Sequence, residues 1–389
     1  MTDSPIAWPN SARASAFSAW LQACATAHSL LPDSLKLASE DASFRRYFRV
    51  HAETGASFII MDAPPAQENC QPFVQVAALL ADAGLNAPQV LAWDQAHGFL
   101  LLSDLGAQTM LEVIAQQPEA EQAQHAYPLY RAAVDALIQW QLASRPGVLP
   151  DYDEALLSRE LALFPDWYVE KHRAIQIDSS MRDKLDGLFA QIKASNLQSL
   201  GGARVFVHRD FMPRNLIAPT LVASRTALPP EGALRLRPGE AGSAAPAGAI
   251  GDTQKQSIGV LDFQDAVYGP ISYDIASLMR DAFISWPEDF VLEITVRYWE
   301  QARKAGLPVG EDFGEFYRAV EWMGLQRHLK ILGIFARLTL RDGKSKYLAD
   351  TPRFIQYARS TCARYRQLGP LMVLLDQIEG NETRVGYTF

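Results

Sequence analysis

VFVHRDFMPRNLI, residues 205–217, is the stretch that decides the fold. Its first part is β-branched and apolar, which predicts a short strand, and polar residues then follow at fixed offsets: His208, Asp210 and Asn215. A second run of the same kind, SIGVLDF at 257–263, contains Asp262. These two runs carry the polar groups on which a prediction of function can rest.

The combination of residue types matches what phosphoryl transfer requires. That reaction needs an acceptor hydroxyl held in line and metal ions that neutralise the phosphate oxygens. Kinases supply an Asp for the hydroxyl, an Asn five residues later and a further Asp on the next strand. We therefore expect Asp210 to be the catalytic base, and Asn215 and Asp262 to hold Mg²⁺.

The alternative is that these residues cap turns, as Asp and Asn often do after a strand. The joint match at four positions of HRDFMPRN, followed by VLDFQD on a second strand, favours catalysis. His208 is expected to support the loop by packing and hydrogen bonding, because Mg²⁺ prefers carboxylate and amide oxygens.

The composition is that of a globular protein with room for two or three lobes. The chain has 389 residues, of which 48% are hydrophobic and 21% charged, and its net charge of −8 argues against a nucleic-acid partner. Three widely separated cysteines favour neither a disulfide framework nor a zinc site. Without a secretory signal or a long apolar run, we expect a cytoplasmic protein with no membrane partner, a small-molecule substrate and a monomeric state.

The pattern up to about residue 106 predicts a small lobe built on an antiparallel sheet. A helix at 11–27 is followed by strands at 45–52 and 57–65 around a short turn, then by a helix at 70–85. Two more strands lie within PQVLAWDQAHGFLLLSDLG, 88–106, on either side of a turn at His97 and Gly98. We assign residues 1–106 to a nucleotide-binding lobe that ends in a hinge.

Residues 107–389 predict a larger and mainly helical lobe. Amphipathic stretches such as those at 127–143 and 153–169 are typical of helices, and helical spacing resumes from Tyr273. Residues 218–256 are rich in Ala, Pro, Gly and Ser and lack periodicity, so we expect a flexible insertion. A regulatory or docking loop is the alternative. Because a long loop adds little closure entropy, the strands on either side can still pair.

HRDFMPRN, VLDFQDA and GPISYDIASL occur in an order that resembles the aminoglycoside phosphotransferase and choline kinase-like family, and the resemblance covers nearly the whole chain. It implies the bilobal protein-kinase-like α+β fold, with ATP and Mg²⁺ as cofactors. It also implies that Asp274 anchors the catalytic loop.

Longer phrases, among them DASFRRYFR at 41–49, MDAPPAQENCQPF at 61–73 and QRHLKILGIFARL at 326–338, look like the anomeric amino-sugar kinases of bacterial cell-wall recycling. That resemblance implies phosphorylation of N-acetylmuramic acid and N-acetylglucosamine at the C1 hydroxyl. Two alternatives stay open: an aminoglycoside, choline or amino-alcohol kinase of the same fold, and a pseudokinase. The pseudokinase has one feature in its favour, since Met61 stands where a third-strand Lys is expected.

The nucleotide site is predicted from the first lobe. With no third-strand Lys, the phosphates are expected to meet Ser43, Arg45, Arg46 and Arg49, although the arginines alternatively form a solvated strand face. Ser103, Asp104 and Leu105 follow the last strand and are the hinge candidates for adenine.

The acceptor site is predicted from the second lobe. The lactyl carboxylate of N-acetylmuramic acid calls for Arg or His. The candidate residues are Glu160, Trp167, Asp265, Arg327 and His328. Each has a structural alternative: aromatic residues at helical spacing are typical of a core, Asp265 of a turn cap, and a basic helix face of a solvated surface.

Overall fold

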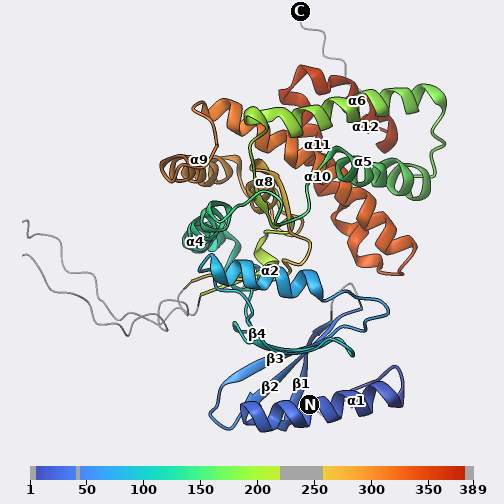
Figure 1. Ribbon diagram of the computed structural model, residues 1–389. Helices are drawn as coiled ribbons and strands as arrows, with labels where there is room; N and C mark the ends of the chain where they lie inside the picture. The colour runs from blue at the N-terminus through green and yellow to red at the C-terminus, as the bar shows by residue number, and fades with distance from the viewer. Residues whose placement is uncertain (1–5, 41–43, 220–256, 382–389) are drawn as a thin grey trace, which may run out of the picture. The chain divides into compact units, whose positions relative to one another are not determined.

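The computed structural model describes residues 6–40, 44–219 and 257–381 (Figure 1). Two compact units make up the chain: the first comprises Met1–Gln108 with Ile217–Leu261, and the second comprises Thr109–Leu216 with Asp262–Phe389. Most of the predicted insertion, from residue 220 to 256, lies outside the described residues, and so does Ser43. No helix of the described part has the length and apolar character that a bilayer crossing requires.

The first unit contains a five-stranded antiparallel sheet in the order β1-β2-β3-β5-β4. Four of these strands were predicted, and β1 was not. Pro32 interrupts the β1 sequence, and the pairing register with β2 shifts between Leu31 and Lys36. Such an edge strand carries no clear alternation of apolar and polar residues. The strand bounds are β1 Leu30–Glu40, β2 Arg46–Ala52, β3 Ser57–Asp62, β4 Val90–Asp94 and β5 Phe99–Ser103.

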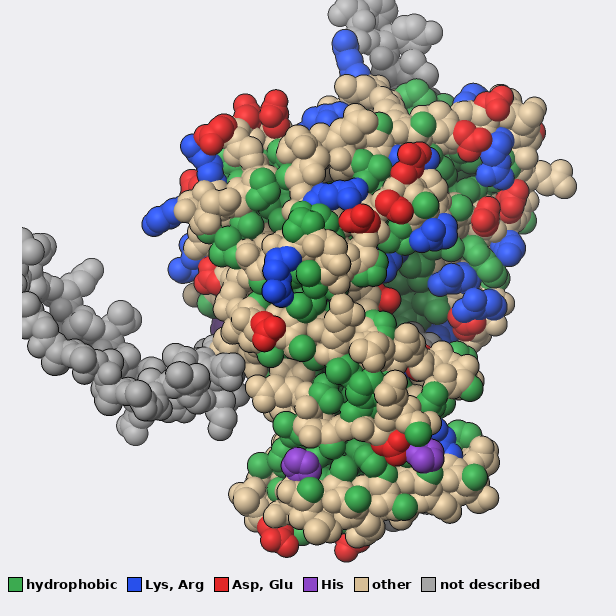
Figure 2. Space-filling model, viewed as in Figure 1, with side chains coloured by type: hydrophobic (Ala, Val, Ile, Leu, Met, Phe, Trp, Pro, Cys, Tyr) green, Lys and Arg blue, Asp and Glu red, His purple; other side chains and the backbone are tan. Residues whose placement is uncertain are grey.

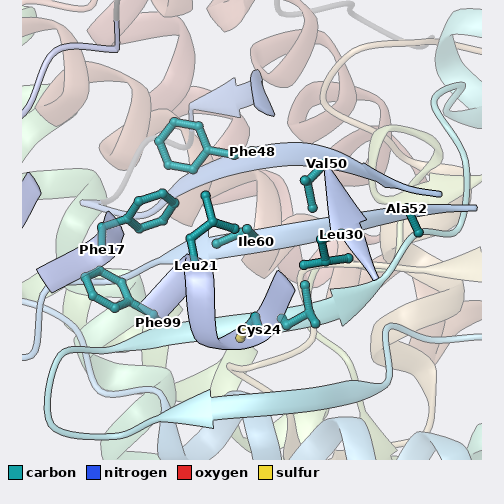
Figure 3. Packing of buried hydrophobic residues seen from close by; sticks show 10 residues of the cluster. Phe17, Leu21, Cys24, Leu30, Phe48, Val50, Ala52, Ile60 and Phe99 are labelled. Atoms are coloured by element: carbon teal, nitrogen blue, oxygen red, sulfur yellow. The ribbon is translucent and has the colours of Figure 1, made fainter. Parts of the chain in front are cut away.

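Helices cover both faces of this sheet, as Figure 1 shows for α1 (Ser11–His28) and α2 (Gln71–Asp82). Phe17 and Leu21 of α1 are buried against Phe48 of β2 and Ile60 of β3, and Figure 3 shows these side chains meeting in one layer. Because both faces are covered, β3 and β5 are apolar on successive residues rather than on alternate ones. The predicted nucleotide-binding residues of β2 and the end of β5 are thereby fixed to a rigid sheet.

The second unit is mainly helical, which confirms the predicted fold class. On the face drawn in Figure 2, Lys and Arg side chains are interspersed with Asp and Glu side chains over this unit. Its helices are α3 Met110–Ala115, η1 Glu119–Glu121, α4 Gln122–Leu142, α5 Glu154–Leu163, η2 Phe164–His172, α6 Ser179–Gln198, η3 Ser199–Gly202, η4 Pro213–Asn215, α8 Ser272–Met279, α9 Glu288–Lys304, α10 Phe313–Leu340, η6 Ser345–Asp350, α11 Thr351–Arg364, η7 Arg366–Leu368 and α12 Gly369–Glu379.

One of the predicted helices changes its winding. The stretch predicted at 153–169 begins as the α-helix α5 and continues as the π-helix η2. Pro165 lies at the start of η2 and has no N–H to donate, so the regular α-helical ladder cannot pass through it. Glu160 therefore lies on the regular helix and Trp167 on the wider one.

Two short strand pairs carry the polar motifs. β6 (Arg204–Val207) pairs with β9 (Val267–Pro270), a strand that the sequence did not predict. β7 (Leu216–Ile217) pairs with β8 (Gly259–Val260), so the strands on either side of the predicted insertion do pair.

Candidate active site

The motif HRDFMPRN forms the loop that leaves β6 and ends in the single turn η4. Val207 is the last residue of β6 and pairs with Val267 of β9. At the other end of the loop, the backbone N–H of Asn215 donates to the carbonyl of Met212 at 2.8 Å. The loop is thus held between a strand and a short turn, and we call residues 208–215 the catalytic loop.

Asp274, in the first turn of α8, binds the start of this loop. Its carboxylate is fully buried and accepts the backbone N–H of His208 at 2.7 Å and of Arg209 at 3.0 Å. His208 is itself buried, and its Nδ1 lies 3.3 Å from the backbone nitrogen of Asp210. Burial would leave these N–H groups unsatisfied without such acceptors, so Asp274 and His208 both support the loop that carries Asp210.

The three residues predicted for catalysis come together in the second unit. The Asn215 side-chain nitrogen donates to the backbone carbonyl of Asp210 at 2.9 Å and lies 3.3 Å from Oδ2 of Asp262. The other Asp262 oxygen accepts from Gln264 at 2.8 Å. Asn215 and Asp262 are far apart in the sequence, but their side chains are neighbours in the structure, and Asn215 also contacts the backbone of Asp210.

The donor set fits a hard divalent cation. Mg²⁺ in phosphoryl-transfer sites is typically bound by one or two carboxylate or amide oxygens together with substrate phosphates. Asn215 uses its nitrogen for the two contacts above, and its carboxamide oxygen has no hydrogen-bond partner among the described residues. This oxygen and the adjacent Asp262 carboxylate are suitable ligands.

Two residues of the site have backbone conformations that side chains disfavour. Arg209 has a φ of 76° and Asp262 a φ of 61°, both in the left-handed region. Such conformations cost about 1–3 kcal/mol and persist where surrounding contacts fix them. Arg209 directly precedes Asp210, and Asp262 is the predicted metal ligand, so the surrounding contacts fix the backbone at both predicted positions.

The charges around Asp210 keep its carboxyl group ionised. Burial by itself would raise its pKa, but the positive charges of Lys330, Arg327 and Arg209 outweigh burial and lower the pKa below the ordinary value. An ionised carboxylate is the form that can accept a proton from a hydroxyl.

The predicted phosphate-binding arginines of the first unit all have carboxylate neighbours. Arg46 pairs with the fully buried Asp62, whose other oxygen pairs with Arg13. Arg49 pairs with Asp104 at 2.6 Å, and Arg45 lies 3.9 Å from Glu68. The guanidinium groups of Arg46 and Arg49 therefore pair with buried carboxylates of the sheet unit instead of forming a solvated strand face.

The hinge candidates adjoin these pairs. Ser103 exchanges hydrogen bonds with Gln89, through its hydroxyl at 2.9 Å and its backbone N–H at 3.0 Å. Asp104 accepts from the backbone N–H of Gly106 at 3.0 Å in addition to Arg49. Leu105, the third hinge candidate, is the residue between Asp104 and Gly106 in the chain.

The predicted acceptor residues fall into two groups. Glu160 and Arg327 are buried and adjoin the catalytic loop through Arg209, at 2.5 Å in each case. His328 is buried elsewhere on α10, where burial lowers its pKa to about 3 and its Nε2 faces the carbonyl of Arg280.

The other two predicted acceptor residues are more open. Trp167 is half-buried and lies under the ammonium group of Lys171, 3.5 Å from the ring centroid. Asp265 has an exposed side chain, and its carbonyl accepts from Arg209 at 3.4 Å.

Four side chains surround Glu160: Arg209, Tyr152, Gln326 and Lys330. Sequence reasoning counted Lys330 only among the basic residues of a helix that favours an anionic or neutral acceptor, and it assigned no role to the other three. The sequence did contain an indication that Gln326 and Lys330 are buried polar residues. The stretch GLQRHLKILGIFA of α10 places polar residues inside an apolar helix, and Gln326, Arg327 and Lys330 are all buried there. Buried charges of this kind require partners.

A two-unit chain with an antiparallel sheet, a helical unit and an Asp-Asn-Asp constellation defines a kinase-like phosphotransferase. A model of the phosphotransferase enzyme family matches residues 34–220 and 250–312. The chain belongs to this family and is an enzyme that transfers a phosphoryl group to an alcohol.

Curated relatives match over most of both chains. The chain is 44% identical to the N-acetylmuramate/N-acetylglucosamine kinase of Pseudomonas aeruginosa over 88% of each chain. It is also 44% identical to the kinase of the same name from Neisseria meningitidis, over 95% of this chain and 97% of the relative.

Solved structures share the fold at low identity. An amicoumacin kinase in complex with AMP-PNP and Ca²⁺ has a TM-score of 0.53 at 15% identity and covers 87% of this chain and 91% of its own. An ethanolamine kinase of Plasmodium vivax has a TM-score of 0.54 at 10% identity, with coverage of 86% and 85%.

Proposed function

We propose that the protein is an ATP- and Mg²⁺-dependent kinase that phosphorylates the anomeric C1 hydroxyl of N-acetylmuramic acid and N-acetylglucosamine. The observation that carries the proposal is the 44% identity to kinases named for these two sugars along nearly the entire chain. Its place is the recycling of peptidoglycan sugars in the cytoplasm, as a monomer.

The catalytic loop is suited to this chemistry. The ionised Asp210 carboxylate accepts the hydrogen bond, and then the proton, of the acceptor hydroxyl. Asn215 and Asp262 would hold Mg²⁺, which neutralises the phosphate oxygens when it is bound. Asp274 and His208 keep the Asp210 backbone in place through the loop contacts described above.

The first lobe, residues 1–106, is assigned to the nucleotide, with Ser103, Asp104 and Leu105 as the hinge. The second, residues 107–389, carries the catalytic loop and the acceptor. Because Arg46 and Arg49 are engaged by Asp62 and Asp104, any contact of these arginines with phosphate requires the carboxylates to share them.

Product analysis tests the proposal directly. The purified protein is incubated with ATP, Mg²⁺ and either sugar, and the reaction is followed by ³¹P NMR. We expect the signal of a sugar 1-phosphate with each sugar. Product from choline or an aminoglycoside alone would redirect the assignment to another alcohol kinase, and ATP binding without turnover of any acceptor would point to a pseudokinase.

Arg214 is a candidate for binding the carboxylate of N-acetylmuramic acid, because it is exposed and precedes Asn215 in the chain. Its guanidinium lies 4.7 Å from the ring centroid of Phe283. N-acetylmuramic acid carries a carboxylate that N-acetylglucosamine lacks. A charge-assisted hydrogen bond of about 1.5 kcal/mol or more corresponds to roughly a tenfold change in affinity.

We therefore expect Arg214→Gln to raise KM for N-acetylmuramic acid by about tenfold while leaving KM for N-acetylglucosamine nearly unchanged. Steady-state kinetics with both sugars measure this ratio. Arg131→Gln is the matched control, since Arg131 is another exposed arginine near an aromatic ring, that of Tyr127 on α4. Equal KM changes for the two sugars would rule out charge recognition by Arg214.

A further inference from the structure

The backbone of Arg209 is fixed by contacts to its nitrogen, its oxygen and its side chain. The N–H donates to Asp274 at 3.0 Å, the carbonyl accepts from Nη1 of Arg327 at 2.5 Å, and the guanidinium pairs with Glu160 at 2.5 Å. These contacts come from α8, α10 and α5. They hold a non-glycine residue at a φ of 76°, directly before Asp210.

Glu160 is the centre of this arrangement. Its carboxylate is buried, with 4% of the residue surface exposed, and both of its oxygens are engaged twice. One oxygen pairs with Arg209 and with Lys330 at 2.9 Å, and the other accepts from the Tyr152 hydroxyl at 2.6 Å and from Gln326 at 2.9 Å. A buried carboxylate with four donors is held in a single orientation, and it transmits that orientation to Arg209.

Arg327 and Lys330 lie one turn apart on α10 and both contact Tyr273. The guanidinium of Arg327 is 4.8 Å from the Tyr273 ring centroid, and the ammonium of Lys330 is 3.3 Å from its hydroxyl. Tyr273 precedes Asp274, so the same pair of cations also contacts the segment that anchors the loop.

We propose that Glu160, Arg327 and Lys330 are positioning residues that clamp Arg209 in its left-handed conformation and thereby aim the Asp210 carboxylate at the acceptor hydroxyl. The inference rests on the proposed role of Asp210. It replaces the prediction that Glu160 and Arg327 bind the acceptor, because both are buried and their polar groups are directed to the loop backbone and to Arg209.

Glu160→Gln keeps the shape of the side chain and removes its charge. We expect kcat to fall by about 100-fold, since a displacement of about 1 Å at a reacting group costs that much. KM for ATP and for the sugar should change little, because Glu160 is buried and both of its carboxylate oxygens are occupied by protein side chains. Lys330→Met should behave in the same way, and Lys330→Arg, which keeps the charge, should recover most of kcat.

The double variant Glu160→Gln/Lys330→Met shows whether the two residues act together on Arg209 or affect kcat independently. Residues that act as one unit have strongly non-additive effects on kcat. We expect the double variant to be no slower than Glu160→Gln alone. Multiplication of the two single losses would contradict the proposal.

Glu321→Gln controls for the loss of any buried acid on this framework. Glu321 is also buried on α10, where it pairs with Arg364 and Tyr365 instead of the catalytic loop. All variants are assayed well below their measured Tm. If Glu160→Gln and Glu321→Gln lower kcat equally, the clamp is refuted, whereas a wild-type protein that forms no sugar phosphate refutes the proposed function instead.

Discussion

Asp210→Asn is expected to lower kcat by about 10²- to 10⁴-fold, the range typical for loss of a catalytic base. The substitution keeps the size of the side chain and leaves the backbone carbonyl that accepts from Asn215. The loop should therefore stay folded, and KM for ATP should remain close to the wild-type value. The assay is the rate of sugar 1-phosphate formation, with ATP affinity measured separately by calorimetry.

Asp178→Asn provides the control for this change. Asp178 caps α6 by accepting the backbone N–H of Met181 at 2.8 Å, and Asn caps helices equally well. The control removes one negative charge without touching the catalytic loop, so its kcat should equal that of the wild type. Near-wild-type turnover by Asp210→Asn would mean that the acceptor proton leaves by another route, and the assignment of Asp210 would fall.

Asp262→Asn is expected to raise the Mg²⁺ concentration needed for half-maximal activity and to reduce kcat. A metal ion at a phosphoryl group contributes several kcal/mol to catalysis, and a loss of about 3 kcal/mol corresponds to roughly 100-fold in rate. Asn is the right replacement, because it tolerates the left-handed φ of 61° that Ala would resist. The effect is therefore attributable to the lost charge rather than to the backbone.

Two measurements check the metal assignment. The first is the Mg²⁺ dependence of the rate at saturating ATP. The second is the rise in Tm that Mg²⁺ with a non-hydrolysable ATP analogue produces, which should shrink in Asp262→Asn and remain intact in Asp178→Asn. An unchanged Mg²⁺ dependence in the Asp262 variant would remove this residue from the metal site.

Local sequence patterns were sufficient for the strands β2 to β5 and for the catalytic loop. β2 and β3 are joined by a tight turn at Gly55, and β4 and β5 by one at Gly98; both glycines have positive φ. In each pair the apolar strand residues and the turn glycine lie within a few residues of each other, so a local pattern predicts the hairpin. HRDFMPRN likewise carries its residues at fixed short offsets, so the close approach of Asn215 to Asp210 follows from the loop itself.

The sequence did not reveal the partners that lie far away along the chain. β9 contains Gly269 and Pro270, residue types that are typical of turns. The segment is nevertheless a strand, because β6 pairs with it along its length. Arg46 and Arg49 had the residue type for phosphate binding, but their engagement depends on Asp62 and Asp104, which only the sheet brings to them.

The sequence by itself determined the class of fold, the position of the HRDFMPRN loop and the phosphotransferase class of the enzyme, because spacing within a strand, turn or loop is a property of neighbouring residues. Only the tertiary structure decided what each charged side chain faces. Glu160 lies 49 residues before Arg209 and 170 before Lys330, and its role depends on three segments packing together in a buried, low-dielectric environment.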